Sequence, residues 1–115
     1  MTDSPRKYIG STGWAEPGGY DEADVSRALL RAENELVVDV KFDRREYTAT
    51  LRRITSNEFR GSYTTKSRPP TQGAVSCRIF TSETGIFLFG HWFEDNQNYV
   101  WWADFDSVEH FQDEV

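Results

Sequence analysis

From residue 36 onward, apolar residues alternate with polar ones, and this period of two constrains the fold more than any other feature of the sequence. Every second residue from Leu36 to Phe42 is apolar, whereas Asp39 and Lys41 fall on the opposite side. Such alternation is typical of a strand with one buried face. The pattern recurs further along the chain, and we predict strands at 36–42, 47–54, 58–64, 75–80, 86–93 and 99–105.

Short polar segments separate these predicted strands, except for one longer loop at 66–73. Parallel neighbours would need crossover connections of about a dozen residues or more, so the short turns favour an antiparallel meander. The parity breaks at Ile54, which indicates a β-bulge near Arg52 and Arg53. A long meander curls or closes because open edges invite aggregation. We therefore predict a mainly β fold, in which a six-stranded antiparallel meander over residues 36–105 forms a highly twisted sheet or small barrel.

Residues 21–33 carry the one helical pattern in the sequence. Val25, Ala28, Leu29 and Ala32 lie at i, i+3, i+4 and i+7, which places them on one face of a helix. A helix of about three turns is marginal alone and must pack on something. We therefore predict a short N-terminal helix that packs on the sheet.

The two ends of the chain are assigned by composition. Residues 1–19 contain Gly and Pro at many positions, and these residues break regular structure, so we expect an extended arm. Residues 106–115 are expected to form an acidic tail. A length of 115 residues predicts a single domain over 1–115.

Composition also narrows the class of protein. Aromatic residues make up 15% of the chain, which argues against intrinsic disorder. No apolar run approaches the roughly 18 residues that a membrane-spanning helix needs, and no signal peptide is visible near the N-terminus. The single cysteine, Cys77, cannot form an internal disulfide, and its parity with Val75 and Ile79 predicts a position in the core. These features predict a cytoplasmic protein without a membrane partner.

Charge is segregated along the sequence. Residues 36–78 carry a net charge of +5, residues 79–115 carry −8, and no Lys or Arg follows Arg78. An acidic end of this kind predicts a basic protein partner, because such fields steer association. The alternative is a surface charge that serves solubility alone. The overall net charge of −6 argues against nucleic acid, whose binding domains are basic.

The sequence shows no catalytic constellation. It contains no G-x-S-x-G elbow, no phosphate-binding P-loop and no glycine-rich dinucleotide motif. His91 shares the parity of Phe87 and Phe89, which favours a partly buried histidine over a general base. His110 lies in the acidic tail, but the two histidines lack the spacing of metal ligands. We therefore predict no enzymatic activity, no cofactor and no metal.

Aromatic residues concentrate on the last two predicted strands. Trp101 and Trp102 are adjacent, so in a strand one points into the core and the other points outward. Exposed tryptophan is favoured at protein interfaces. The first hypothesis is therefore a non-catalytic protein-interaction module, such as an acidic accessory, inhibitor or regulatory protein, that binds its partner through Trp102, Glu94, Asp95 and Asp104. The alternative is that the N-terminal arm and helix cover the outward aromatic residues.

A second hypothesis is a β-barrel that binds a small molecule. The segments 59–63 and 89–93 each place a glycine two residues before a large aromatic residue, which permits a bend in a closed barrel. These two short segments are loosely similar to small ligand-binding barrels of the avidin and lipocalin type. The hypothesis itself places the small molecule in an aromatic-lined cavity. The residues we would assign to that cavity are Tyr63, Phe89, His91, Trp92 and Trp101.

Overall fold

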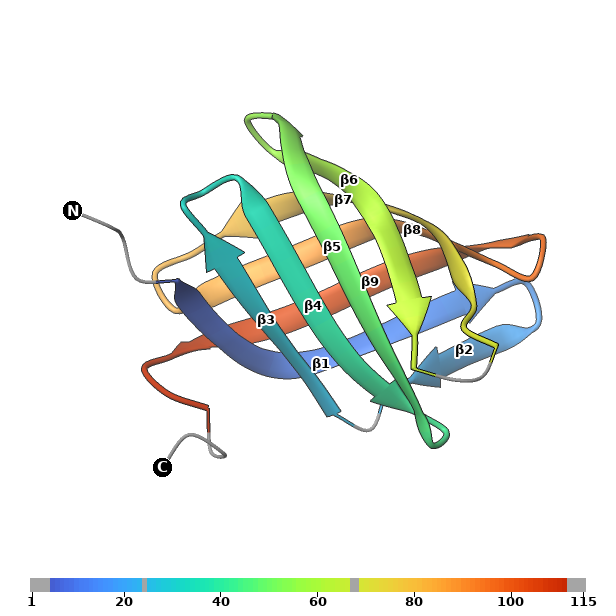
Figure 1. Ribbon diagram of the computed structural model, residues 1–115. Helices are drawn as coiled ribbons and strands as arrows, with labels where there is room; N and C mark the ends of the chain where they lie inside the picture. The colour runs from blue at the N-terminus through green and yellow to red at the C-terminus, as the bar shows by residue number, and fades with distance from the viewer. Residues whose placement is uncertain (1–4, 24, 67–68, 112–115) are drawn as a thin grey trace.

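Antiparallel pairing joins nine strands into a closed barrel in the computed structural model, which describes residues 5–23, 25–66 and 69–111 (Figure 1). The strands are β1 (Arg6–Glu16), β2 (Gly19–Glu22), β3 (Val25–Arg31), β4 (Glu35–Phe42), β5 (Arg45–Thr55), β6 (Glu58–Thr65), β7 (Gln72–Thr81), β8 (Gly85–Glu94) and β9 (Gln97–Val108). Consecutive strands from β3 to β9 are neighbours, and β1 pairs with both β3 and β9. This pairing closes the sheet and removes the open edges that the meander would otherwise expose.

The barrel wall has eight strands, and β2 is an extra short strand beside it. β1 pairs with β3 through its first half, from Arg6 to Gly10, and with β2 through its second half, from Gly13 to Glu16. β2 and β3 therefore follow one another along the same edge of β1. All four residues of β2 are exposed.

The prediction of a helix over 21–33 was wrong, and so was the count of six strands. The segment instead contains the end of β2 and the whole of β3. Within β3, Ser26, Ala28 and Leu30 are buried and alternate with more exposed residues, so a period of two was also present. Alanine and leucine favour helices locally, but pairing of β3 with β1 and β4 overrides that preference. Within the described residues, no helix is long and apolar enough to cross a membrane.

The predicted extended arm over 1–19 is instead largely a strand of the wall. Its residues from Lys7 to Ala15 pair along β9, between Val108 and Val100, and this pairing closes the barrel. The last strand extends into the segment predicted as an acidic tail and ends at Val108, while residues 112–115 of that segment lie outside the described residues.

Strands β4 to β9 match the six predicted strands. The predicted β-bulge is confirmed one residue later, as a register shift between Arg53 and Thr55. The turn between β4 and β5 and the turn between β8 and β9 each contain two residues with positive φ, namely Asp43, Arg44, Asp95 and Asn96. Two such residues match the twist of the flanking strands in a tight hairpin.

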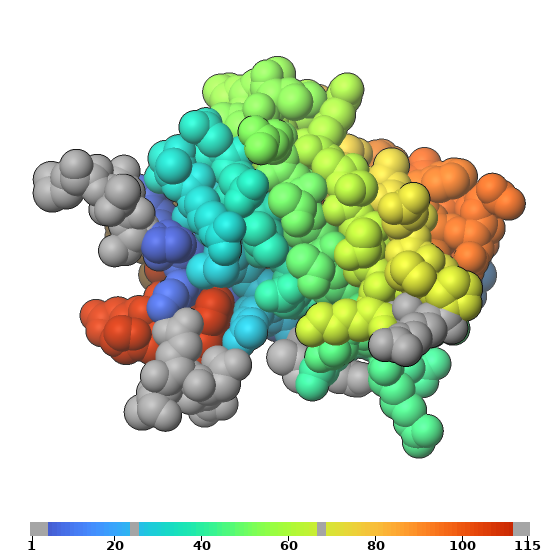
Figure 2. Space-filling model, in the orientation of Figure 1, coloured from blue at the N-terminus to red at the C-terminus, as the bar shows by residue number. Residues whose placement is uncertain are grey.

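Large side chains fill the barrel interior. Trp92, Trp101, Tyr63, Phe59 and Phe105 are all fully buried there. On the front of the barrel, side chains of β3 to β6 cover the sheet, as Figure 2 shows in cyan to yellow-green. The interior is therefore a packed core rather than an open channel.

The glycines of the two segments 59–63 and 89–93 lie where neighbouring strands approach closely. A Cβ on Gly61 would overlap the Thr50 carbonyl oxygen, and a Cβ on Gly90 would overlap the Ser76 carbonyl oxygen. Each glycine thus permits a close approach of two neighbouring strands that any side chain would prevent. The bend predicted at these glycines stays a prediction, and the close approach of the strands is a different reason for glycine at both positions.

Candidate functional site

Four phenylalanine side chains lie on the outside of β7 and β8, and we call this surface the phenylalanine face. On β8 the residues from Ile86 to Trp92 alternate between core and surface. The outward set includes Phe87, Phe89 and Phe93, which are 39%, 49% and 43% exposed, and Phe80 on β7 is 51% exposed. A contiguous apolar patch of this kind marks an interaction surface more often than scattered exposed residues do.

Two pairs of aromatic residues stand opposite one another across neighbouring strands at the phenylalanine face. Phe80 stands opposite Phe87 on the neighbouring strand, and their ring centroids are 6.5 Å apart. Trp102 on β9 stands opposite Phe89. Trp102 is half-buried because its indole lies against Gly13, where a Cβ would come within 2.6 Å of the ring. Cross-strand pairing therefore places aromatic residues opposite one another from β7 to β9.

The phenylalanine face is bordered by opposite charges on its two sides. Asp104 is exposed and stands opposite Phe87 on the β9 side, with Asp106 two residues further along the strand. Arg78 is exposed and stands opposite Phe89 on the β7 side. The acidic border is formed by β9, and this strand contains no Lys or Arg.

Two hollows lie at the ends of the phenylalanine face. One, of about 190 Å³, is lined by residues that include Phe80, Phe87 and Asp104. The other, of about 450 Å³, is lined by residues that include Arg60, His91 and Phe93. Apolar projections beside shallow hollows give a partner surface places to insert its own side chains.

A second feature is a pocket of about 100 Å³ at one mouth of the barrel, which we call the mouth pocket. Its aromatic lining residues are Trp14, Phe42, Tyr47, Trp92 and Tyr99. Glu94 lies at its floor, where its carboxylate accepts hydrogen bonds from Trp92 Nε1 at 3.1 Å and from the Tyr47 hydroxyl at 3.5 Å. The pocket is smaller than the ~300 Å³ that drug-sized ligands occupy.

The mouth pocket has a negative electrostatic environment. Burial, followed by the Glu94 carboxylate, raises the pKa of Tyr47 and of Tyr63. Burial also raises the pKa of Tyr99, and four carboxylates add to this effect: Glu16, Glu94, Asp95 and Asp21. All three phenols are therefore protonated near neutral pH, and Tyr47 donates its proton to Glu94.

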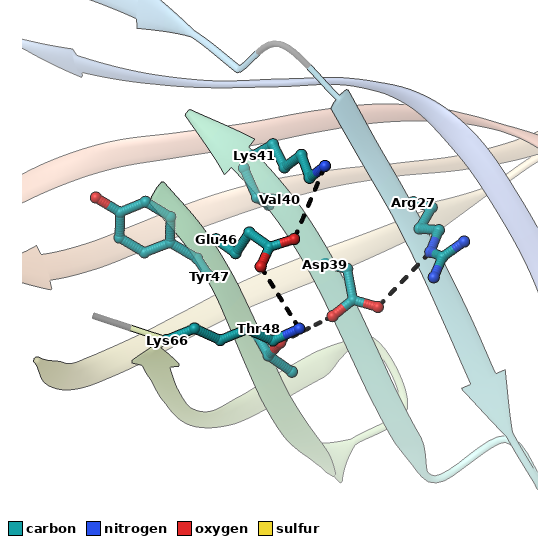
Figure 3. A pocket seen from close by; sticks show the side chains of 8 residues that line it. All are labelled: Arg27, Asp39, Val40, Lys41, Glu46, Tyr47, Thr48 and Lys66. Carbon is teal, nitrogen blue, oxygen red and sulfur yellow. Dashed lines mark hydrogen bonds and ion pairs between the residues drawn. The ribbon is translucent and has the colours of Figure 1, made fainter. Parts of the chain in front are cut away.

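A larger pocket, of about 330 Å³, lies on the outer surface of β3 to β5 (Figure 3). Arg27 pairs with Asp39 at 3.8 Å, and Glu46 pairs with Lys41 at 3.8 Å and with Lys66 at 3.6 Å. Each of the described cations that line this pocket, Arg27, Lys41 and Lys66, thus lies beside a carboxylate. Exposed pairs of this kind contribute about 0.2–1 kcal/mol each to stability.

The structure divides the four residues predicted to bind a partner between two surfaces. Trp102 and Asp104 lie on the outer surface beside the phenylalanine face. Glu94 points to the barrel mouth, and Asp95 lies in the turn between β8 and β9. The four residues therefore do not form one continuous surface.

The residues predicted to line a cavity are also divided. Tyr63, Trp92 and Trp101 are buried in the packed interior. Phe89 and His91 are exposed on the outside of β8, so His91 is not the partly buried histidine that its parity suggested. The five residues do not enclose a common cavity.

Sequence reasoning missed several residues of both sites. Phe80 was predicted to point outward from the strand 75–80 but was not assigned to a site, and Phe93 could have been included because apolar residues on both faces of 86–93 signal an outward apolar row. Trp14 and Tyr47 at the mouth pocket come from distant strands, and no local pattern joins them. In the described part of the chain, no group of three His, Cys, Asp or Glu residues is placed to hold a metal ion. The predicted core position of Cys77 is confirmed.

Comparisons with known proteins bear on the fold. No known protein family matches this sequence, and no curated protein matches it either. A solved structure with a similar fold is that of a point mutant of the vaccine antigen transferrin binding protein B from Haemophilus parasuis, with a TM-score of 0.60 and 15% sequence identity. The match covers 96% of this chain and 27% of that chain, so the present chain spans about a quarter of its neighbour. At this identity the likeness shows the fold alone.

Proposed function

We propose that this protein is a non-catalytic protein-interaction module that binds its partner through the phenylalanine face. The observation that carries this proposal is the row of four phenylalanine side chains on β7 and β8, each at least 39% exposed. Leaving such apolar area in water has a cost of roughly 25 cal/mol per Å², which burial against a partner recovers.

The packed interior supports a partner on the outside over a ligand inside. Trp92 and Trp101 occupy the centre of the barrel and are at most 1% exposed. Ring contacts continue through the interior, with Trp92 stacked on Tyr63 at 4.5 Å and Trp101 next to Trp92 at 5.6 Å. A ligand of ordinary size would have to displace these rings.

The partner we propose presents apolar side chains with Lys or Arg toward β9. Asp104 and Asp106 are exposed on that side of the phenylalanine face, and β8 and β9 contain no Lys or Arg. Opposite charges at the border of an apolar contact increase the association rate and select the orientation. The net charge of −6 disfavours a second copy of this chain as the partner.

The test compares surface variants of the folded protein. Immobilised wild-type protein and the variants Phe89→Ser and Asp104→Lys are exposed to lysate of the native host, and retained proteins are quantified by mass spectrometry. A retained candidate is then purified, and its Kd for each form is measured by calorimetry. We expect Phe89→Ser and Asp104→Lys to weaken binding at least about tenfold, as for central residues of an interface.

The matched control is Val37→Ser, which changes a half-buried residue on the outside of β4, across the barrel. It should leave the Kd unchanged. Equal loss of binding in Val37→Ser and Phe89→Ser would contradict the proposal, as would retention of the candidate by both Phe89→Ser and Asp104→Lys. A dimer of this chain that Phe89→Ser dissociates would replace the basic partner with a second copy.

A further inference from the structure

The mouth pocket combines two properties that neither the packed core nor the phenylalanine face has. Aromatic rings from five separate strands form its walls, and carboxylates from three strands border it. The acidic residues are Glu16 on β1, Asp21 on β2 and Glu94 on β8. Among the described residues that line the pocket, none is Lys or Arg.

The rings that line the pocket meet one another at steep angles. Trp14 contacts Trp92 edge to face, with centroids 5.4 Å apart and an interplanar angle of 78°. Trp14 also lies 5.5 Å from Phe42 at 56° and 6.2 Å from Tyr47 at 46°. Aromatic faces attract cations, and several faces around one site are the usual arrangement for quaternary ammonium groups.

The acidic residues increase this attraction. Glu16 is exposed and accepts a hydrogen bond from Gln97 Nε2 at 2.6 Å, so its carboxylate is held in place beside the pocket. Glu94 is fixed by Trp92 Nε1 at 3.1 Å. Arg45 is exposed, and its interactions with Tyr47 and Glu94 raise its pKa, so its guanidinium partly offsets the negative charge of the three lining carboxylates.

Trp14 supplies a second observation at the pocket. The residue is 8% exposed, and its Nε1 atom is buried and has no hydrogen-bond partner within the described residues. An unpaired buried N–H costs about 1–3 kcal/mol. Because Trp14 lines the pocket, a small shift of its ring would let a ligand with an acceptor oxygen near its cation accept this hydrogen bond.

We propose that the mouth pocket binds a small organic molecule with a methylated ammonium group and a nearby hydroxyl or carbonyl oxygen. The volume of about 100 Å³ suits a head group of this size and not a larger ring system. The carboxylates at the border select against ligands that carry a phosphate or carboxylate of their own. The mouth pocket is separate from the phenylalanine face, so either proposal can be wrong while the other holds.

The test uses choline and its uncharged carbon isostere, 3,3-dimethylbutan-1-ol, as probes of equal shape. Binding is followed by NMR through the indole N–H signals of the four tryptophans. We expect choline to shift the signals of Trp14 and Trp92 and to leave that of Trp102, on the outer surface, unchanged. The isostere should bind at least about tenfold more weakly, because it lacks the charge.

Two outcomes would overturn the proposal. Equal affinity for the two probes would show that charge plays no part. No shift of the Trp14 and Trp92 signals at about 50 mM choline, which excludes a Kd in the low millimolar range, would show that no site exists. Phosphocholine tests whether the ligand is a free cation or a head group that carries a phosphate. It should bind more weakly than choline.

Variants locate the binding energy within the mouth pocket. Asp21→Asn removes an exposed charge and should weaken choline binding about two- to fivefold without affecting the fold. Tyr99→Leu removes a partly buried ring and should weaken binding about tenfold. Asp104→Asn, a carboxylate on the outer surface, is the matched control and should have no effect. If Tyr99→Leu does not fold, Asp21→Asn still tests the proposal. An unchanged affinity of Asp21→Asn for choline would contradict the assignment of the ligand to the mouth pocket.

Discussion

Thr12 connects the strand that closes the barrel to its central tryptophan, and its replacement by valine tests that role. Thr12 is fully buried, and its hydroxyl accepts a hydrogen bond from Trp101 Nε1 at 2.8 Å and donates one to the Trp102 carbonyl at 2.6 Å. Thr12→Val keeps the shape and removes both bonds. An unsatisfied buried donor costs about 1–3 kcal/mol, and the lost bond to the carbonyl adds about 1 kcal/mol.

The expected destabilisation is therefore about 2–4 kcal/mol. For a chain of 115 residues, the unfolding entropy converts each kcal/mol into a Tm change of about 4 °C. Calorimetry should thus show a decrease in Tm of about 8–16 °C for Thr12→Val. Thr12→Ser is the matched control, since it keeps the hydroxyl and loses one methyl group, and it should cost about 1 kcal/mol. If Thr12→Val is no less stable than Thr12→Ser, the hydroxyl does not hold Trp101 as described.

Three further predictions concern stability and surface. Gly90→Ala should destabilise the protein by about 3 kcal/mol or more in urea unfolding, because the new Cβ would overlap the Ser76 carbonyl. Gly18→Ala is the control, because a Cβ there meets no atom within 4 Å, and it should stabilise the protein by about 0.4–1 kcal/mol. Burial raises the pKa of the Cys77 thiol from its ordinary 9.0 to about 12, so its contribution to stability is complete below pH 9 and decreases as the pH rises toward 12. Wild-type protein should therefore lose about 2 kcal/mol more than Cys77→Ala between about pH 7.5 and 10.5, and an equal loss in both would contradict this shift. Phe93→Ser should reduce the fluorescence of an apolar dye bound to the protein. The free energy of unfolding should change by no more than about 1 kcal/mol, because the side chain is 43% exposed. Unchanged dye fluorescence would show that Phe93 is not part of the apolar surface.

Residues 36–105 could be predicted from sequence because their side chains alternate between a buried and an exposed face. β4 shows this most clearly, since Leu36, Val38 and Val40 are buried and the residues between them are half-buried. The bulge in β5 was visible as a break in the same parity. These features depend on neighbours in the sequence, so a local pattern is sufficient.

The first 33 residues could not be predicted in the same way. β1 carries glycine where atoms of neighbouring strands approach closely, as at Gly10 and Gly13, where a Cβ would overlap those atoms. β3 contains Ala28 and Leu30, which suit a helix as well as a strand. Closure by β1 and β9 joins residues about 90 positions apart, and no local pattern encodes that contact.

The candidate sites were predictable only in part, for the same reason. Trp102 and Asp104 were identified because both lie on one strand. Grouping Glu94 with them failed because a period of two places Glu94 on the inner side with Trp92. The mouth pocket joins Trp14, Tyr47 and Glu94 through strand closure, which only the folded chain reveals.

The central claim, that the phenylalanine face meets the partner, is tested most directly by hydroxyl-radical footprinting of the protein with and without a purified partner. Phe80, Phe87, Phe89 and Phe93 are exposed in the free protein and should all be oxidised. In the complex their oxidation should decrease several-fold, whereas Tyr20, which is 71% exposed on β2, should remain as reactive as before. Unchanged oxidation of the four phenylalanines in a saturated complex would contradict the account and place the interface elsewhere on the barrel.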